Sequence, residues 1–280
     1  MSKLSLNMIA FNLAGAAVLL TVSGYVVLSF FKSGTVERCS MRYPAGQQFA
    51  LDGDDDGTPL TPIELQARAG LREWGVLQNA KILAAPDAPG GKVLEVSLTK
   101  TENEDRMDEN GIGFVWPVTN MQGSESACLS YSVFLPEGFE FKASGYLPGL
   151  YGARDVADID AEQPGEGFAA RVSWAQAGDV GLEVRSPSTQ GYWQGTKMIS
   201  RWPLGRWLLI EQEVKLNTPG VDDGILRMWV DGALKVENLG ANLRAAPESR
   251  LTGVISDIGY ARSASDPVAI KLSPFIVQWQ

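Results

Sequence analysis

The stretch from Gly205 to Lys235, GRWLLIEQEVKLNTPGVDDGILRMWVDGALK, decides the fold that the sequence predicts. From Leu208 to Leu216, apolar side chains alternate with mainly polar ones, which is typical of a strand that packs one face against a core. Two groups of turn-forming residues follow, Asn217-Thr-Pro-Gly220 and Asp222-Asp-Gly224. The chain is therefore expected to reverse its direction after this first strand.

Two further strands complete an antiparallel meander. A second alternating run, Ile225–Val230, leads into Asp231-Gly232, the strongest short hairpin signal, and then into a third strand at Ala233–Leu239. On the second strand the side chains expected to face the core are Leu226, Met228 and Val230. The meander is thus predicted to have one buried face and one solvent-facing face.

The solvent-facing side of this meander is a candidate glycan surface. Arg227 and Trp229 are expected there side by side. An aromatic ring beside a cation suits a sugar, because the C–H face of the sugar stacks and its hydroxyl groups take hydrogen bonds. Gln212, on the apolar face of the first strand, is a further candidate contact.

The overall composition excludes several classes of protein. The chain has 280 residues, enough for one large all-β domain with appendages, and 45% of them are hydrophobic. With 24 basic and 33 acidic residues the formal charge is −9, which argues against a nucleic-acid partner and disfavours a polyanionic ligand unless a local basic patch overrides the field. The 30 glycines, 15 prolines and 8 tryptophans are typical of turn-rich β proteins that handle carbohydrate.

The chain contains no histidine and only two cysteines. A Ser-His-Asp or Cys-His relay and a histidine-ligated zinc or iron site are therefore excluded, so any general base must be Tyr, Lys, Asp or Glu. Cys39 and Cys128 pair if the domain lies in an oxidising compartment, and otherwise remain two buried thiols.

The N-terminal residues 1–32 are predicted to anchor the chain in a membrane. The uncharged run Met8–Phe31 is long enough to cross a bilayer as one helix. The cations after it, Lys32, Arg38 and Arg42, would hold the main domain in the cytoplasm by the positive-inside rule. A glycan-binding domain needs the opposite side, so we expect a single-pass protein of the inner or plasma membrane with a periplasmic or extracellular domain.

Residues 33–60 are interpreted as a linker that contains an acidic loop. Asp52-Gly-Asp54-Asp-Asp56-Gly57 matches the opening of a calcium loop, with Asp52, Asp54 and Asp56 as candidate ligands. The closing glutamate should stand at Ile63, so a solvated acidic turn is the alternative. No other cofactor is expected.

Residues 61–280 are predicted to form one β domain. A capping box at Thr61–Glu64 starts one short helix that runs to about Trp74. Short strands then recur with turn signals between them, at Lys81–Ala84, Val93–Leu98, Gly113–Val118 and Ser126–Leu135. This spacing predicts an all-β fold, an antiparallel β-jelly-roll sandwich, in place of alternating βαβ units.

Two further strands, Gly167–Trp174 and Gly181–Arg185, place polar side chains on one sheet face. If the strands are neighbours, that face carries four residues, which Arg227 and Trp229 extend: Arg171, Ser173, Glu183 and Arg185. The face is either a ligand cleft or an ordinary exposed surface with salt bridges.

Three groups of residues, taken together, resemble the polysaccharide lyase 14 family of alginate and glucuronan lyases. They are Leu147-Pro-Gly-Leu-Tyr-Gly152, Phe168-Ala-Ala-Arg-Val-Ser-Trp174, and the series from Trp207 through Asn217-Thr-Pro-Gly220 to Trp229-Val-Asp-Gly232. The resemblance covers residues 93–240 and, more loosely, the final strands to Trp279. It implies a jelly roll with a concave glycan-binding face.

The resemblance also implies that most catalytic positions are substituted. The family uses a lysine before Leu-Pro-Gly, a serine and an arginine on the Phe-x-x-Arg strand, and two tyrosines on the next strand. Here Arg171 remains, while the other positions hold Tyr146, Ala169, Glu183 and Arg185. The glycine-rich turn expected near the end is replaced by Asp257-Ile-Gly-Tyr-Ala-Arg262.

Three functions stay open on this reading. The first is a glycan-binding protein without catalysis, which partners polysaccharide synthesis or export proteins. The second is a divergent lyase that cleaves a uronate polysaccharide by β-elimination, with Tyr146 or Tyr260 moving the proton and Arg171 neutralising the substrate carboxylate. The third is a structural sandwich in a protein complex, with Trp193, Trp202 and Trp229 as protein contacts.

Overall fold

The computed structural model describes residues 36–53, 57–69, 72–98, 110–121, 123–141, 143–153, 167–190, 192–195, 202–261 and 267–280. The chain divides into two compact units, Met1–Glu37 and Arg38–Gln280. The segment predicted to be a membrane anchor, Met8–Phe31, lies outside the described residues. Among the residues that are described, no helix is both long and apolar enough to cross a membrane.

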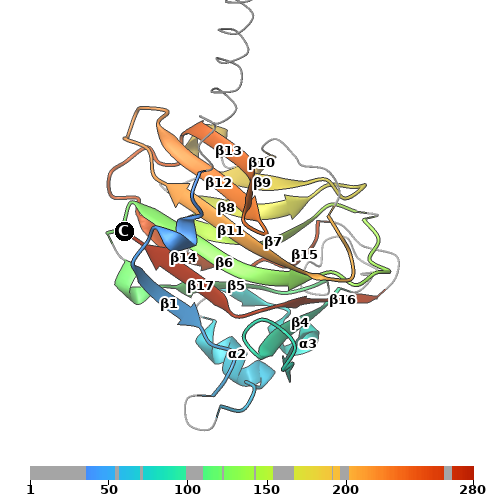
Figure 1. Cartoon of the computed structure of the whole chain (residues 1–280). Coiled ribbons are helices and arrows are strands. Elements are labelled where there is room, and N and C mark those ends of the chain that lie inside the picture. The colour runs from blue at the N-terminus through green and yellow to red at the C-terminus, as the bar shows by residue number, and fades with distance from the viewer. Residues whose placement is uncertain are drawn as a thin grey trace, which may run out of the picture. The chain divides into compact units, whose positions relative to one another are not determined.

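The second unit is a sandwich of two antiparallel sheets, as a jelly roll requires (Figure 1). Sheet I runs in the order β13-β12-β11-β6-β16-β4-β3, and β17 joins β1 to β6. Its described strands are β1 (Ala45–Phe49), β3 (Ala80–Ala84), β4 (Lys92–Leu98), β6 (Ser126–Phe134), β11 (Trp207–Lys215), β12 (Gly224–Val230), β13 (Ala233–Ala241), β16 (Val268–Leu272) and β17 (Phe275–Trp279).

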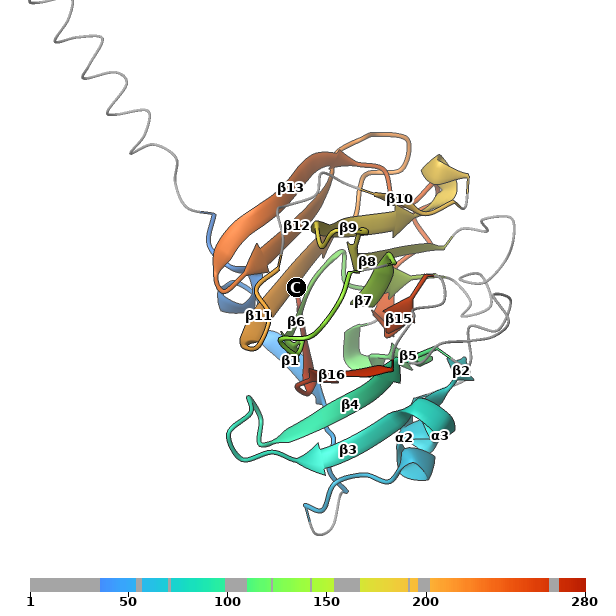
Figure 2. The same cartoon turned by 90° about the vertical axis from the view of Figure 1, so that its right-hand side faces the viewer.

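Sheet II runs in the order β10-β9-β8-β7-β14-β5-β2, and β15 pairs with β7. Its described strands are β2 (Glu73–Trp74), β5 (Gly113–Pro117), β7 (Gly145–Gly152), β8 (Phe168–Trp174), β9 (Val180–Arg185), β10 (Gln194–Gly195), β14 (Leu251–Ile255) and β15 (Gly259–Tyr260). Figure 2 shows the two layers from the side, with β11 to β13 in one and β7 to β9 in the other. The predicted all-β sandwich is confirmed.

The predicted short helix is α2, Pro62–Arg68, and the capping box is present as expected: Thr61 and Glu64 bond each other's backbone N–H groups. The helix ends earlier than predicted, because the chain enters β2 at Glu73, and a second short helix, α3, follows at Val76–Asn79. The buried side of α2 is formed by Leu65, and Ala69 directly after it is also buried, while Ile63 is 70% exposed.

Much of the segment predicted to be a linker belongs to the domain. Strand β1 pairs along its whole length with β17, and its Phe49 ring stacks on Phe114 and Phe275, with centroids 5.5 and 5.9 Å apart. Cys39 forms a disulfide with Cys128 of β6, across 89 residues of sequence. Of the two alternatives for these thiols, pairing is therefore the one the structure shows.

The residues around Cys39 cover part of the outer face of sheet I. The 3-10 helix η1, Cys39–Met41, contacts β6 and β11. Ser40 donates a hydrogen bond to Glu211, and both Arg42 and Tyr43 donate to Glu213. Burial alone would raise the pKa of Glu213, but the hydrogen bonds from Arg42, Tyr43 and Arg227 lower it overall. This face of β11, predicted to meet solvent, is thus buried.

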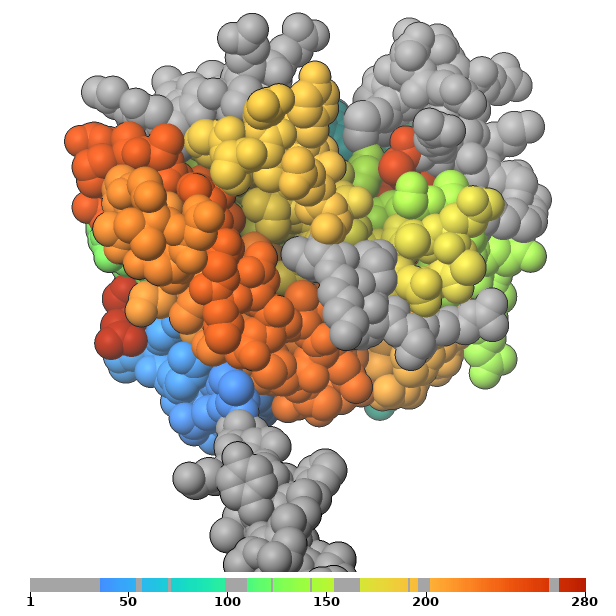
Figure 3. Space-filling model, turned by 90° about the horizontal axis from the view of Figure 1, so that it is seen from above, coloured from blue at the N-terminus to red at the C-terminus, as the bar shows by residue number. Residues whose placement is uncertain are grey.

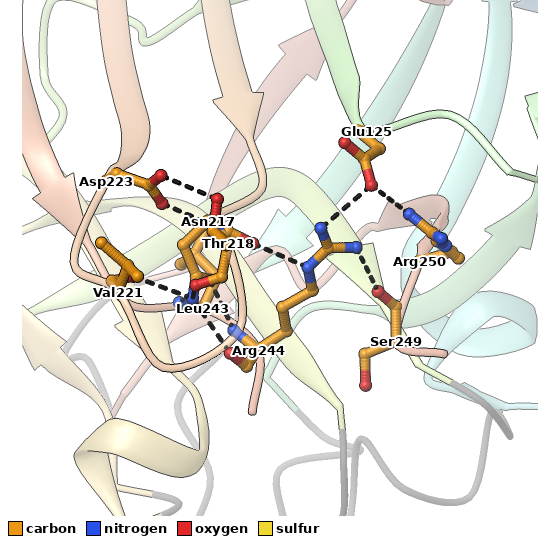
Figure 4. Close-up of polar contacts among 9 residues, drawn as sticks. All are labelled: Glu125, Asn217, Thr218, Val221, Asp223, Leu243, Arg244, Ser249 and Arg250. Carbon is orange, nitrogen blue, oxygen red and sulfur yellow. Dashed lines mark hydrogen bonds and ion pairs between the residues drawn. The ribbon is translucent and has the colours of Figure 1, made fainter. Parts of the chain in front are cut away.

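The predicted meander of β11, β12 and β13 is confirmed, and the Asn-Thr-Pro-Gly motif organises the loop between its first two strands. The buried Asn217 side chain accepts hydrogen bonds from the backbone N–H groups of Leu243 and Arg244 and donates to backbone carbonyls of its own loop (Figure 4). Arg244 in turn donates to Glu125 and to the Ser249 carbonyl. The motif therefore joins three loops and has a structural role.

A bulge in β7 breaks the alternation of that strand. The register with β8 shifts between Leu147 and Gly149, so Leu147 and Leu150 both face the core although they are three residues apart. Pro148 has no N–H to donate, and Gly149 is required because a Cβ there would lie 1.9 Å from the Ala170 oxygen. The Leu-Pro-Gly motif is this bulge.

Gln212 of β11 crosses the core to satisfy the bulge. Its Oε1 accepts a hydrogen bond from the Leu150 N–H, 3.2 Å away, and its Nε2 donates to the Ala170 carbonyl, 2.9 Å away. The Tyr131 hydroxyl of β6 donates to the Pro148 carbonyl at 3.1 Å. Gln212 is completely buried and joins the two sheets. The prediction that it contacts a glycan is therefore wrong.

Replacing Gln212 with methionine, which has a similar shape, should lower the free energy of unfolding by about 3 kcal/mol. Two buried backbone groups, at Leu150 and Ala170, would lose their partners, and each such loss costs ~1–3 kcal/mol. Urea unfolding measures the change. Gln48→Met, at an exposed position on β1, is the control and should change stability by less than ~0.5 kcal/mol. Equal unfolding midpoints for the two variants would contradict the bridging role.

Candidate functional site

The outer face of sheet II brings together the polar residues predicted on its strands. Arg171 of β8 lies directly opposite Glu183 of β9, and Ala169 lies opposite Arg185. Tyr146 of β7 lies opposite Ser173. The face predicted from alternation on these strands is therefore confirmed as a cluster around Arg171.

The guanidinium of Arg171 is held on both faces and along its edges. Its central carbon lies 3.9 Å from the Tyr146 ring centroid and 3.8 Å from the Trp193 ring centroid, so the group is sandwiched between two aromatic rings. Its Nε and Nη2 donate to Glu183 Oε2 at 3.4 and 3.3 Å, and its Nη1 lies 3.3 Å from Asp257 Oδ2. Arg171 is only 7% exposed.

A second arginine shares the Asp257 carboxylate. Arg72 precedes the edge strand β2, and its Nη1 donates to Asp257 Oδ1 at 2.9 Å while its Nη2 donates to Oδ2 at 3.4 Å. Asp257 is itself buried. The site therefore contains an ionic network in which two carboxylates, Glu183 and Asp257, face two guanidinium groups, with Arg171 and Asp257 buried and Glu183 and Arg72 partly exposed.

Two tyrosine hydroxyls at this face lack partners among the described residues, those of Tyr146 and Tyr151. The β7 bulge puts both rings on the outer side, because residues five apart would face opposite sides of a regular strand. Burial raises the pKa of Tyr146 to about 12, against a smaller opposing effect of Arg171, and burial also raises the pKa of Tyr151. At neutral pH both groups are phenols, which can donate a proton or a hydrogen bond but do not act as bases.

Tyr260, the other candidate proton carrier, lies elsewhere. Its ring stacks on Phe139 and meets Trp174 edge-on in the core between the sheets. Its hydroxyl donates to the Glu140 carbonyl at 3.2 Å. Tyr260 alternates with Gly259 on β15 and so faces away from the Arg171 cluster, which removes it from the candidate site.

The meander residues do not extend the site, because β11 and β12 belong to sheet I. Trp229 is completely buried opposite Glu211, on the face that η1 covers, so it offers no surface to a sugar. Arg227 is bound by Glu213 at 3.1 Å and Glu237 at 2.8 Å. The prediction that both residues join Arg171 in one trough is wrong.

The other tryptophans and two charged residues also differ from the prediction. Trp202 is buried in the core, so of the three tryptophans predicted as protein contacts only Trp193 is partly exposed, and it covers Arg171. Asp257 and Arg72 were not predicted as site residues. The one signal for Asp257 is that it opens the segment 257–262, at which the sequence was expected to depart from the family that it resembles.

The calcium ligands predicted in the acidic loop are tested only at Asp52. Its carboxylate lies 3.3 Å from the Lys92 ammonium, and its carbonyl accepts a hydrogen bond from Arg68. Asp54 and Asp56 lie outside the described residues. A calcium site therefore stays a prediction. Ligand atoms of Cys39, Cys128 and Glu211 lie within 4.8 Å of one another, but both sulfur atoms are used by the disulfide.

A cleft of about 650 Å³ lies apart from the Arg171 cluster, between the edge strands of the two sheets. Its wall combines β13 with the ends of β9 and β10, and it includes Leu226, Asn238 and Asn242. Figure 3 shows these segments side by side, β12 and β13 in orange and the region of β10 in gold. No aromatic side chain lines this cleft among the described residues, so it lacks the surface on which a sugar stacks.

Comparison with known families identifies the domain. The sequence profile of polysaccharide lyase 14 matches residues 86–261, more than half of the chain. This chain belongs to the polysaccharide lyase 14 family. The resemblance carried by the Leu-Pro-Gly and Asn-Thr-Pro-Gly motifs is thereby confirmed. A comparison with curated protein sequences gives no match.

Solved structures of alginate and glucuronan lyases share the fold. The alginate lyase of Aplysia kurodai superposes with a TM-score of 0.70 at 18% identity, over 85% of this chain and 99% of that one. The alginate lyase vAL-1 of Chlorella virus gives 0.62 at 18% identity, over 78% and 97%. The endo-β-1,4-glucuronan lyase of Trichoderma reesei gives 0.53 at 11% identity, over 85% and 96%. At these identities the likeness shows a shared fold.

The stability of this polysaccharide lyase 14 domain should depend on alkaline pH through Tyr146. Its pKa is raised from 10.0 to about 12 in the folded state, so the folded state binds the phenolic proton more tightly than the unfolded chain. This contribution is complete below pH 10 and is lost as the pH rises toward 12. Unfolding free energies measured across that range should fall by about 2–3 kcal/mol more in the wild type than in Tyr146→Phe.

Tyr192→Phe is the control for this titration, because Tyr192 is 73% exposed. It should follow the wild-type pH dependence. A Tyr146→Phe variant with the same alkaline loss of stability as the wild type would show that the Tyr146 phenol is not protected by burial.

Proposed function

We propose that this chain binds a polysaccharide on the outer face of sheet II and does not cleave it. The observation that carries the proposal is the state of Arg171. Its guanidinium is bound by Glu183 and Asp257 and sandwiched by Tyr146 and Trp193, so it is not held ready to neutralise a substrate carboxylate.

The other requirements of β-elimination support the same proposal. The reaction needs a base that removes the C5 proton and an acid that protonates the leaving oxygen. By the resemblance, Tyr146 stands where the family has its lysine, and a phenol with a pKa of about 12 does not serve as a base at neutral pH. Glu183 and Arg185 stand in place of the two tyrosines, and Glu183 is occupied by Arg171.

Binding of a polysaccharide is supported by the solved structures that share the fold. They include alginate and glucuronan lyases, and a variant of the alginate lyase Aly36B has been solved in complex with alginate tetrasaccharide. That structure shares the fold of this chain with a TM-score of 0.64 at 14% identity. The partly exposed residues at the margin of the Arg171 cluster, Trp193, Glu183 and Arg185, give such a chain a ring and polar groups to contact.

We propose that residues 1–32 anchor the chain in the inner or plasma membrane and that the domain faces the periplasm or the exterior. The Cys39–Cys128 disulfide supports this side, because oxidising compartments preserve disulfides. The polysaccharide would then be handled during its export or assembly, together with the proteins that carry out those steps.

The second candidate is a divergent lyase. One contact favours it: the Arg171 guanidinium lies 3.9 Å from the Tyr146 ring, so an anion-binding group and a proton donor are neighbours. In this reading the Tyr146 phenol protonates the leaving oxygen, Arg171 exchanges its internal carboxylates for that of the substrate, and a further group supplies the base.

Incubation of the full-length chain with alginate or glucuronan should yield no unsaturated product. Ultraviolet absorbance of the double bond formed by β-elimination measures this, and an active lyase from the family serves as the positive control. Retention of the chain on an array of immobilised polysaccharides should still be observed. Release of unsaturated product that Arg171→Gln abolishes would establish the lyase instead.

Trp193→Ala should weaken retention on the polysaccharide about tenfold, equivalent to ~1.4 kcal/mol, because it removes the partly exposed ring at the site. Trp207→Ala is the matched control. Trp207 is also partly buried, but it lies on sheet I, where it packs on Phe134 with centroids 5.6 Å apart. Equal retention of both variants would remove Trp193 from the binding surface.

A further inference from the structure

The Arg171 guanidinium has little surface left for a sugar carboxylate, because it is 7% exposed. Each of the three nitrogen atoms already has a carboxylate partner at 3.3–3.4 Å, either Glu183 or Asp257. The two faces of the group are covered by the rings of Tyr146 and Trp193. A uronate that approached Arg171 would compete with these groups for the same three nitrogen atoms.

The same holds for the neighbouring cation. Both terminal nitrogens of Arg72 donate to Asp257, which is buried together with Arg171. The charges of Arg72 and Arg171 are thus matched by those of Glu183 and Asp257. A third carboxylate brought into this network would lack a matched cation, and an uncompensated charge in a buried site is strongly unfavourable.

Within the described part of this face, one further cation is Arg185, at the half-exposed edge opposite Ala169. The whole chain carries a formal charge of −9, which repels a polyanionic chain at long range.

What the site does offer is suited to uncharged sugars. The buried hydroxyls of Tyr146 and Tyr151 lack partners within the described part of the chain, and each can both donate and accept a hydrogen bond. Tyr151 packs with Ala169 in a small apolar cluster, and Trp193 packs against that cluster with part of its surface exposed. Hydroxyl groups and the C–H face of a neutral pyranose match this arrangement.

We propose that Asp257, with Glu183, acts as an internal substitute for a uronate carboxylate, so that this site selects uncharged glycans. The inference rests on the proposed glycan-binding function and names its ligand class. Asp257 is then a specificity-determining residue: it occupies Arg171 and Arg72 and thereby excludes acidic sugars.

The test compares two polymers that differ only in charge: alginate, and the same alginate after reduction of its carboxylates to primary alcohols. The full-length wild-type chain should be retained at least ten times more tightly on the reduced polymer, at low and at moderate salt. Asp257→Asn frees donors of both arginines and should raise retention on alginate at least tenfold. Glu183→Gln, at a more exposed position, should change retention in the same direction and does not disturb the buried carboxylate.

Asp87→Asn is the matched control, because it makes the same change of net charge at an exposed loop position and should alter neither retention. Tighter wild-type retention on alginate than on its reduced form would overturn the inference while leaving glycan binding intact. So would folded Asp257→Asn and Glu183→Gln variants that gain no retention on alginate. Retention on neither polymer, nor on any other polysaccharide of the array, would overturn the proposed function and the inference with it.

Discussion

The hydrogen bonds of Gln212 are the interaction on which the arrangement of the site depends. They hold the bulge of β7 by binding the Leu150 N–H and the Ala170 carbonyl from the opposite sheet. The bulge adds one residue to β7, so Tyr146 and Tyr151 both reach the outer face while Leu147 and Leu150 both reach the core. Without the bulge, one of the two tyrosines would point inward. If that were Tyr146, Arg171 would lose the ring that packs on its guanidinium.

Alternation of side chains predicted the strands well, because a half-buried strand leaves a clear period of two in the sequence. It located β8, β9 and the meander and placed Leu226 and Met228 in the core. It placed Trp229 and Gln212 on the correct faces of their strands but predicted the wrong role for both. Alternation says which side of a strand a residue faces, but it does not say whether a segment from elsewhere, here η1, covers that side. It also cannot show that a buried amide will bind a bulge in the other sheet.

The candidate site was predictable only where its residues share neighbouring strands. Arg171 and Glu183 lie opposite each other on β8 and β9, so their pairing follows from the strand pattern. Asp257 contacts Arg171 although the two are 86 residues apart in sequence. Arg72 contacts Asp257 from 185 residues away. No local pattern marks such contacts.

The disulfide of Cys39 determines how mechanical tension enters the domain. A pull on the chain ahead of Arg38 passes through the covalent bond to Cys128, in a strand that is paired on both sides, by β11 and by β17. Strand β1 follows Cys39 in the chain and, among the described strands, pairs only with β17, so by itself it would peel away one residue at a time. With the disulfide in place the load bypasses β1, and the domain would have to shear a central strand before it yields.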